Sequence, residues 1–220
     1  MSGNNASYSF VKCAIGQGET KEMFGIELGL AEKLNVYYPD DLFFIIKFAK
    51  GATELYSHWI SPLSTANPGP MYNNFIKFVK TNIKYLQNKN YEVKIEGMCW
   101  MQGESDSFFI DTATNYKFHL MNLIHDIRLT FDKYSSIDGI AFIDAHIQAN
   151  PLYWVYYDLI NESKNYVSKL SKMNVIIDTN LNGLTCSNEP KEKPDIPHYD
   201  SLSEIKLGHL FADEIIKFFD

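Results

Sequence analysis

The stretch Ile95–Asp106, IEGMCWMQGESD, is the most informative part of the sequence. It begins as an apolar run typical of a buried strand and ends in polar residues and a glycine: Gln102, Gly103, Glu104, Ser105 and Asp106. Polar side chains placed in a core cost free energy unless each finds a partner. Since ligands bind at the carboxyl ends of strands in open α/β sheets, the segment predicts a functional site. The structural alternative is a polar turn in which Asp106 caps the next helix.

Outward from this stretch, short apolar runs alternate with longer amphipathic segments. The predicted strands are Leu42–Ala49, Val93–Met101, Ile140–Ile147 and Asn174–Asp178. The predicted helices are Phe24–Val36, Tyr72–Leu86, Thr112–Phe131, Tyr156–Leu170 and Ser201–Phe219, the last with Ser201 or Ser203 as its cap. Repeated strand–helix alternation predicts an α/β fold with a mostly parallel sheet covered on both faces.

The bulk properties narrow the class of protein. With 220 residues the chain is expected to form one domain, residues 1–220. Its net charge of −7 and the lack of a basic stripe argue against nucleic acid or a membrane surface as partners. Three widely spaced cysteines predict neither a disulfide framework nor a zinc site. Without a signal-like or membrane-spanning segment in the sequence, we expect a soluble, cytoplasmic protein.

A second polar cluster, Asp195-Ile-Pro-His198, precedes the last predicted helix. Histidine changes charge near neutral pH and is therefore a natural proton shuttle. A carboxylate three residues earlier can hold one ring nitrogen and stabilise the charged ring. Taken alone, the pattern is more simply a surface loop.

The two clusters together resemble the carbohydrate-esterase branch of the SGNH hydrolases, which contains sialate O-acetylesterase-like and acetylxylan esterase-like proteins. Phe24–Ala31 is similar to the Phe-Gly-Pro-Glu-Leu-x-x-Ala segment of that branch, with Ile26 in place of proline. Lys47–Leu55 is similar to its Lys-x-Ala-x-Gly-Gly-Thr-x-Leu segment. The resemblance continues from His198 through the final helix and covers residues 24–216.

The resemblance implies a flavodoxin-like three-layer α/β/α fold and removal of O-acetyl groups from carbohydrates by a Ser-His-Asp-type mechanism, without cofactor or metal. His198 would be the general base and Asp195 its orienting carboxylate. Gly51 and Gln102 would stabilise the oxyanion. The remaining residues of the motif would hold loops of the site or bind substrate: Gly103, Glu104 and Asp106. The partner is then an acylated carbohydrate or glycan, and we expect His198 and Gln102 to converge at one rim of the sheet.

The nucleophile is not identified, because the Gly-Gln-Ser-Asn motif of the family is missing. In one alignment Tyr8–Ile15 is the first strand and Gly18 stands in the serine position. Loss of the first strand would leave its neighbouring strands with unpaired backbone groups, which costs free energy and therefore favours this alignment. In the other, Gly16–Gly18 is a loop leading into the first helix, and the strand and its serine precede Met1. The local pattern favours this second alignment, which makes the chain an N-terminally incomplete member.

Three N-terminal serines are substitute nucleophiles: Ser2, Ser7 and Ser9. Ser2 has no preceding strand that would hold its hydroxyl. A non-catalytic module that binds glycans or a protein is the alternative function. A third hypothesis has Glu104 activating water with His198 as the acid. Among the other histidines, His146 ends a predicted strand and faces the ligand side, and His58 either lines the pocket or lies at the surface. The rest are expected to be solvated or packed: His119, His125 and His209.

Overall fold

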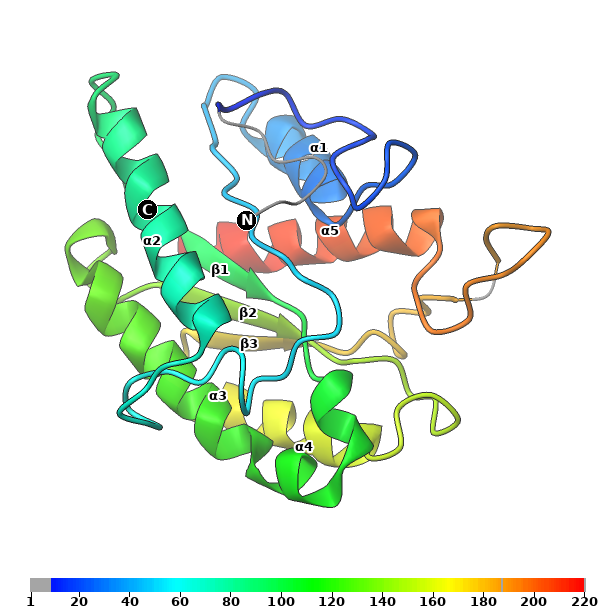
Figure 1. Ribbon diagram of the computed structural model, residues 1–220. Coiled ribbons are helices and arrows are strands. Elements are labelled where there is room, and N and C mark those ends of the chain that lie inside the picture. The colour runs from blue at the N-terminus through cyan, green and yellow to red at the C-terminus, as the bar shows by residue number, and fades with distance from the viewer. Residues whose placement is uncertain (1–8, 187, 220) are drawn as a thin grey trace. The chain divides into compact units, whose positions relative to one another are not determined.

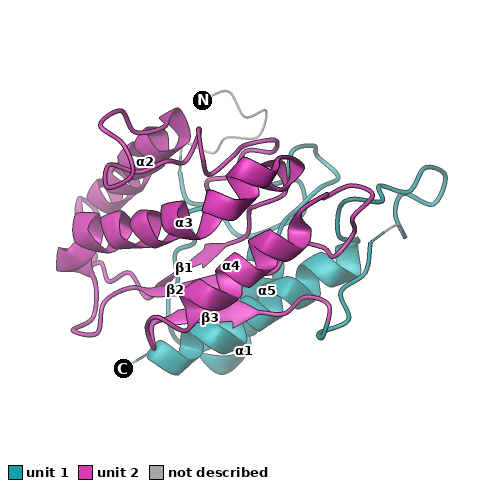
Figure 2. Cartoon of the chain, turned by 90° about the horizontal axis from the view of Figure 1, so that it is seen from below, with its two compact units in different colours: residues 1–47, 181–220 teal, residues 48–180 magenta. Residues whose placement is uncertain are grey.

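The computed structural model describes residues 9–186 and 188–219. The chain divides into two compact units (Figure 2). The central unit contains residues 48–180, and the terminal unit contains residues 1–47 and 181–220. The prediction of one domain over residues 1–220 stays a prediction.

The central unit is built on a parallel sheet in the order β1-β2-β3 (Figure 1). The strands are β1 (Gly97–Trp100), β2 (Ala141–Ala145) and β3 (Asn174–Ile177). Trp100 is paired with Asp144, and Ala145 with Ile177, so the residues that follow the strands lie at one edge of the sheet. All five residues of β2 are buried, as expected for the middle strand of a covered parallel sheet.

Three helices belong to the central unit: α2 (Pro70–Gln87), α3 (Ile110–Phe131) and α4 (Tyr157–Ser168). A 3-10 turn over Ser105–Phe108 leads into α3. Helices α3 and α4 pack against each other, and α4 also contacts β3. The inward stripe of α3 follows helical spacing and is almost fully buried: Tyr116, Leu120, Leu123, Ile124 and Ile127.

The terminal unit contains α1 (Glu27–Tyr37) and α5 (Ser201–Ile215), which pack closely. Glycine makes this approach possible, because a Cβ on Gly29 would lie 2.2 Å from the Ile205 carbonyl oxygen. The predicted caps of α5 are wrong. Asp200 is the N-cap residue, and its Oδ1 accepts a bond of 3.0 Å from the Ser203 N–H. A carboxylate also complements the positive end of the helix, which a hydroxyl does less well.

The predicted strand Leu42–Ala49 is wrong, because these residues pair with no strand. Tyr8 lies outside the described residues, and residues 9–15 form no strand either. Apolar residues of both segments pack through their rings instead: Phe43 stacks on Phe219 at 5.6 Å between ring centroids, and Phe10 meets Phe44 at 4.9 Å. An apolar run predicts burial, but a strand also requires a neighbour that supplies hydrogen bonds.

The other predicted helices and strands are present, and the predicted α/β class with a parallel sheet is confirmed. The strands are shorter than expected; β1, for example, has four residues where Val93–Met101 was predicted. Within the described residues β1 pairs with β2 alone, so a longer hydrogen-bonded ladder does not form. No helix in the described part of the chain is both long and apolar enough to cross a lipid bilayer.

Candidate functional site

Gln102 lies just beyond the carboxyl end of β1 and is buried. Its amide nitrogen donates to the Thr53 carbonyl oxygen at 2.9 Å and to Asp106 Oδ2 at 2.6 Å. Its amide oxygen accepts from the Tyr116 hydroxyl at 3.1 Å. Both amide hydrogens are therefore engaged, and an oxyanion would have to replace one of these acceptors. The role of Gln102 as an oxyanion donor stays a prediction.

Asp106 fastens a distant loop to the end of β1. Its carboxylate is 1% exposed and accepts from the N–H groups of Leu55 at 2.8 Å and Tyr56 at 3.1 Å. Burial raises the pKa of Asp106, and the bond from Gln102 opposes the rise. The alternative in which Asp106 caps the next helix is wrong, because α3 has no side-chain cap. The predicted role in holding loops agrees with these contacts, whereas binding of substrate by Asp106 stays a prediction.

Gly103 and Glu104 differ in how much contact they make. Gly103 has φ +140° and is buried, and a Cβ there would lie 2.5 Å from Ile160 Cγ2. This position therefore requires glycine. The Glu104 carboxylate is half-buried and makes no hydrogen bond or ion pair to any residue that the structure describes. Gly51 is exposed, with open space where a side chain would be.

A buried ion pair that the sequence analysis missed joins α4 to β2. Lys164 Nζ, on α4, donates to Asp144 Oδ1 on β2 at 2.8 Å and to the Ala145 carbonyl oxygen at 2.7 Å. Burial raises the pKa of Asp144 to about 6, and Lys164 opposes the rise. Burial also raises the pKa of Tyr116, whose hydroxyl bonds to the Gln102 carbonyl at 2.8 Å. The sequence held one signal of this ion pair: a charged residue, Asp144, lies inside the apolar run of residues 140–147.

His146, at the end of β2, is held by protein groups. Its Nε2 lies 2.9 Å from Asn165 Oδ1 and its Nδ1 lies 3.6 Å from Asp178 Oδ2. The ring is buried, and this burial lowers its pKa. These contacts favour a packing role for His146 over the ligand-facing role expected from the sequence.

The Asp195–His198 pair lies in the terminal unit, before α5. His198 Nδ1 is 2.8 Å from Asp195 Oδ2, the contact expected of an orienting carboxylate and its imidazole. The side chain of His198 is 71% exposed and that of Asp195 is 48% exposed, which leaves His198 Nε2 accessible to a substrate. Their catalytic roles stay predictions, as does the expected convergence of His198 with Gln102, because each lies in a different unit.

Residues of two further resemblance segments also meet in the terminal unit. Lys47 Nζ bonds to Glu27 Oε1 at 2.8 Å and to the Gln17 carbonyl oxygen at 3.1 Å. The N–H groups of Gly16 and Gly18 both donate to the Met23 carbonyl at 2.9 Å, and Gly16 has φ +92°. These residues thus form a closed loop before α1, as the second alignment expects. Ser2 and Ser7 lie outside the described residues.

Glu204, on α5, is a second group that sequence reasoning missed. Burial raises its pKa to about 7, and the nearby carboxylate of Glu27 adds to the rise. The positive charges of Lys47 and His198 oppose it. The carboxyl group of Glu204 therefore lies within electrostatic reach of Glu27, Lys47 and His198.

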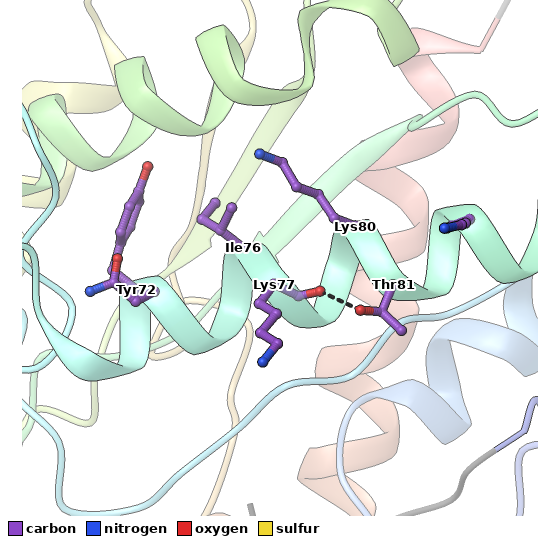
Figure 3. Close-up of a pocket in the computed structure, with 7 residues that line it drawn as sticks. Tyr72, Ile76, Lys77, Lys80 and Thr81 are labelled. Carbon is purple, nitrogen blue, oxygen red and sulfur yellow. Dashed lines mark hydrogen bonds between the residues drawn. The ribbon is translucent and has the colours of Figure 1, made fainter.

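A surface pocket of about 440 Å³ lies along α2 (Figure 3). Three lysines are among the residues that line it: Tyr72, Asn73, Ile76, Lys77, Lys80, Thr81 and Lys84. No predicted site residue lines it, so we do not assign it to the candidate site. In the described ranges, no three His, Cys, Asp or Glu side chains gather closely enough to hold a metal ion.

The family model described as carbohydrate esterase, sialic acid-specific acetylesterase matches residues 10–217. The chain belongs to this carbohydrate esterase family. The resemblance to the sialate O-acetylesterase-like branch is thereby confirmed. The match includes both polar clusters, the Gln102–Asp106 segment and the Asp195–His198 pair.

Solved structures agree on the fold of this family member. NanS is 18% identical, with a TM-score of 0.69 over 93% of this chain and 74% of its own. A protein from Arabidopsis thaliana is 24% identical, with a TM-score of 0.53 over 69% of this chain. The present chain spans 54% of the length of the Arabidopsis protein. The comparison with curated proteins gave no match.

Proposed function

We propose that this chain is a carboxylic ester hydrolase that removes O-acetyl groups from carbohydrates. The observation that supports this most is the 2.8 Å contact between His198 Nδ1 and Asp195 Oδ2 in a member of the carbohydrate esterase family. The family description makes O-acetylated sialic acid the first substrate to test. The ester group itself carries no charge, so no cationic pocket is required at the reacting carbonyl.

In this proposal His198 Nε2 accepts the proton of the attacking hydroxyl and returns it to the leaving alcohol. Asp195 fixes the tautomer through Nδ1 and stabilises the imidazolium that forms. Gly51 N–H and the Gln102 amide stabilise the oxyanion, for which one donor lowers the barrier by about 3 kcal/mol. Gly103 and Glu104 contribute to binding of the sugar, with Asp106 holding the loop of residues 53–56.

The test compares hydrolysis of p-nitrophenyl acetate and of O-acetylated sialic acid by the wild type and by His198→Ala. His209→Ala is the matched control, because His209 also contacts a carboxylate, Glu32, at 2.8 Å but belongs to no motif. We expect His198→Ala to lower kcat/KM by about 10²- to 10⁴-fold, and His209→Ala to leave it unchanged. Equal rates for the wild type and both variants would count against the proposed function.

A non-catalytic glycan-binding role is the second candidate, and the observation that favours it is Gly18. In the first alignment this glycine occupies the serine position, and a glycine has no hydroxyl that could attack an ester. Calorimetric titration with O-acetylated and de-acetylated sialic acid separates the candidates. Binding of the acetylated sugar without turnover supports the binding role, whereas acetate release that depends on His198 contradicts it.

A further inference from the structure

A serine, a histidine and a glutamate meet within one loop of the central unit. Ser57 Oγ lies 2.7 Å from Glu54 Oε2 and 2.9 Å from His58 Nδ1. All three residues precede α2 in the segment after Gly51. Their geometry is local, so it holds within the central unit alone.

The bonds in this loop identify which ring nitrogen can act as a base. The Glu54 N–H donates to His58 Nδ1 at 3.1 Å, so Nδ1 carries a lone pair and the proton is on Nε2. The Ser57 hydroxyl has a single proton, and both the carboxylate and Nδ1 are within reach to accept it. A hydroxyl in contact with an unprotonated imidazole nitrogen is the arrangement that activates serine nucleophiles.

The loop around these residues is rigidly anchored. Asp106 accepts from the N–H groups of Leu55 and Tyr56, which fixes the backbone just before Ser57. The Leu55 side chain is fully buried, and the His58 carbonyl accepts from the Met71 N–H at 2.9 Å at the start of α2. An anchored backbone holds a reactive group in place without a loss of entropy at the moment of reaction.

Ser57 itself is exposed, on a segment that runs past the carboxyl ends of the strands (Figure 1). Its N–H donates to no group in the part of the chain that the structure describes. A free backbone N–H beside the attacking oxygen can donate to the oxyanion that forms on the carbonyl oxygen of the attacked ester. The loop therefore offers nucleophile, base and oxyanion donor within two adjacent residues.

We propose that Ser57 is an acyl-accepting nucleophile whose hydroxyl proton passes to His58 Nδ1. Ser57 Oγ attacks the ester carbonyl carbon, and the hydroxyl proton moves to His58 Nδ1. The protonated Nδ1 no longer accepts from the Glu54 N–H and instead donates to the Glu54 carboxylate. Collapse of the tetrahedral intermediate breaks the bond to the alkoxide, which takes the proton. Water then attacks the acyl-Ser57 ester by the same route and releases the carboxylic acid. This site uses neither His198 nor Asp195 and is independent of the proposed function.

The test uses a fluorophosphonate, which phosphonylates activated serines and releases fluoride, on the full chain. Intact-mass measurement and peptide mapping locate the adduct. We expect an adduct on Ser57, none at this position in Ser57→Ala, and labelling of Ser57 at least about 100-fold slower for His58→Asn. Ser64→Ala is the matched control, because Ser64 Oγ also contacts a histidine, His119 Nδ1 at 3.1 Å, but accepts a bond from Asn122. It should label at the wild-type rate.

His198→Ala separates this site from the proposed function. Labelling of Ser57 at the wild-type rate in His198→Ala supports the Ser57–His58 pair, whatever that variant does to hydrolysis of acetylated sugars. The absence of an adduct on Ser57, or unchanged labelling of Ser57 in His58→Asn, overturns the proposal. Labelling of Ser57 that is lost in His198→Ala overturns the assignment of His58 as the base.

Discussion

Replacement of Lys164 by methionine is expected to destabilise the protein in a manner that depends on pH. The Lys164 side chain has no exposed surface, and its partner Asp144 is 6% exposed. Methionine preserves most of the volume but removes the charge, so the Asp144 carboxylate stays buried without its cation. Removal of one partner from a buried ion pair costs about 3–5 kcal/mol of unfolding free energy.

The pH dependence follows from the raised pKa of Asp144. Its pKa of about 6 in the folded protein, against an ordinary 3.8, means that the fold binds this proton more readily than the unfolded chain. The contribution of Asp144 to stability is therefore greatest below pH 3.8 and falls as the pH rises to about 6, by about 3 kcal/mol at about 1.4 kcal/mol for each pH unit. Without the positive charge of Lys164, the pKa of Asp144 rises further. The variant should lose about 3–5 kcal/mol at pH 8 and less than about 2 kcal/mol at pH 5, where Asp144 is neutral.

Urea unfolding at pH 5 and pH 8, followed by tryptophan fluorescence, measures this difference, because Trp59 and Trp100 are buried in the central unit. Lys172→Met is the control: Lys172 bonds to Asp138 at 2.8 Å, but both side chains are more than half exposed. It should change stability by less than about 0.5 kcal/mol. A cost below about 1 kcal/mol for Lys164→Met at pH 8, or an equal cost at both pH values, would refute the reasoning.

Three further substitutions test other contacts. Glu204→Gln removes a carboxyl group whose pKa is about 7, against an ordinary 4.5, so its contribution to stability falls as the pH rises between those values. The variant should therefore be more stable than the wild type by about 1–2 kcal/mol at pH 8 and little changed at pH 4.5, as measured by Tm. Asp106→Asn replaces one carboxylate oxygen by an NH2 group, which then faces one of the two loop N–H groups that Asp106 accepts from in the wild type. Hydrogen exchange of that loop should speed up and stability should fall by about 2–3 kcal/mol, whereas unchanged exchange contradicts the anchoring role. Gly29→Ala forces α1 away from the Ile205 carbonyl and should cost about 1–3 kcal/mol, whereas Gly51→Ala, whose Cβ meets nothing, should be neutral in the same thermal melt.

The helices were predictable because their apolar spacing is a local property. Tyr116, Leu120 and Leu123 repeat at helical intervals, and the structure buries that stripe. The segment Leu42–Ala49 was misread for the opposite reason. Its apolar residues predict burial, but only a neighbouring strand can make a strand of them, and their rings pack on aromatic residues elsewhere in the chain.

Two local features of the candidate site could be predicted from the sequence. The polar residues after β1 and the Asp195–His198 contact both follow from short spacings. The sequence did not reveal which group each of these side chains contacts. Asp144 and Lys164 are twenty residues apart, and Asp106 binds amides about fifty residues earlier, so neither pairing leaves a periodic signal.

The amino-acid sequence by itself determined the α/β class, the positions of the helices, and membership of a carbohydrate esterase family. Periodicity, turn residues and short motifs are encoded locally, so they can be read without coordinates. The tertiary structure alone decided that the Gln102 amide is engaged by Thr53 and Asp106, and that the Ser57 hydroxyl lies against His58 on the loop they hold. Such contacts depend on which buried groups must satisfy one another's hydrogen bonds, and that requirement is met only when distant segments pack together.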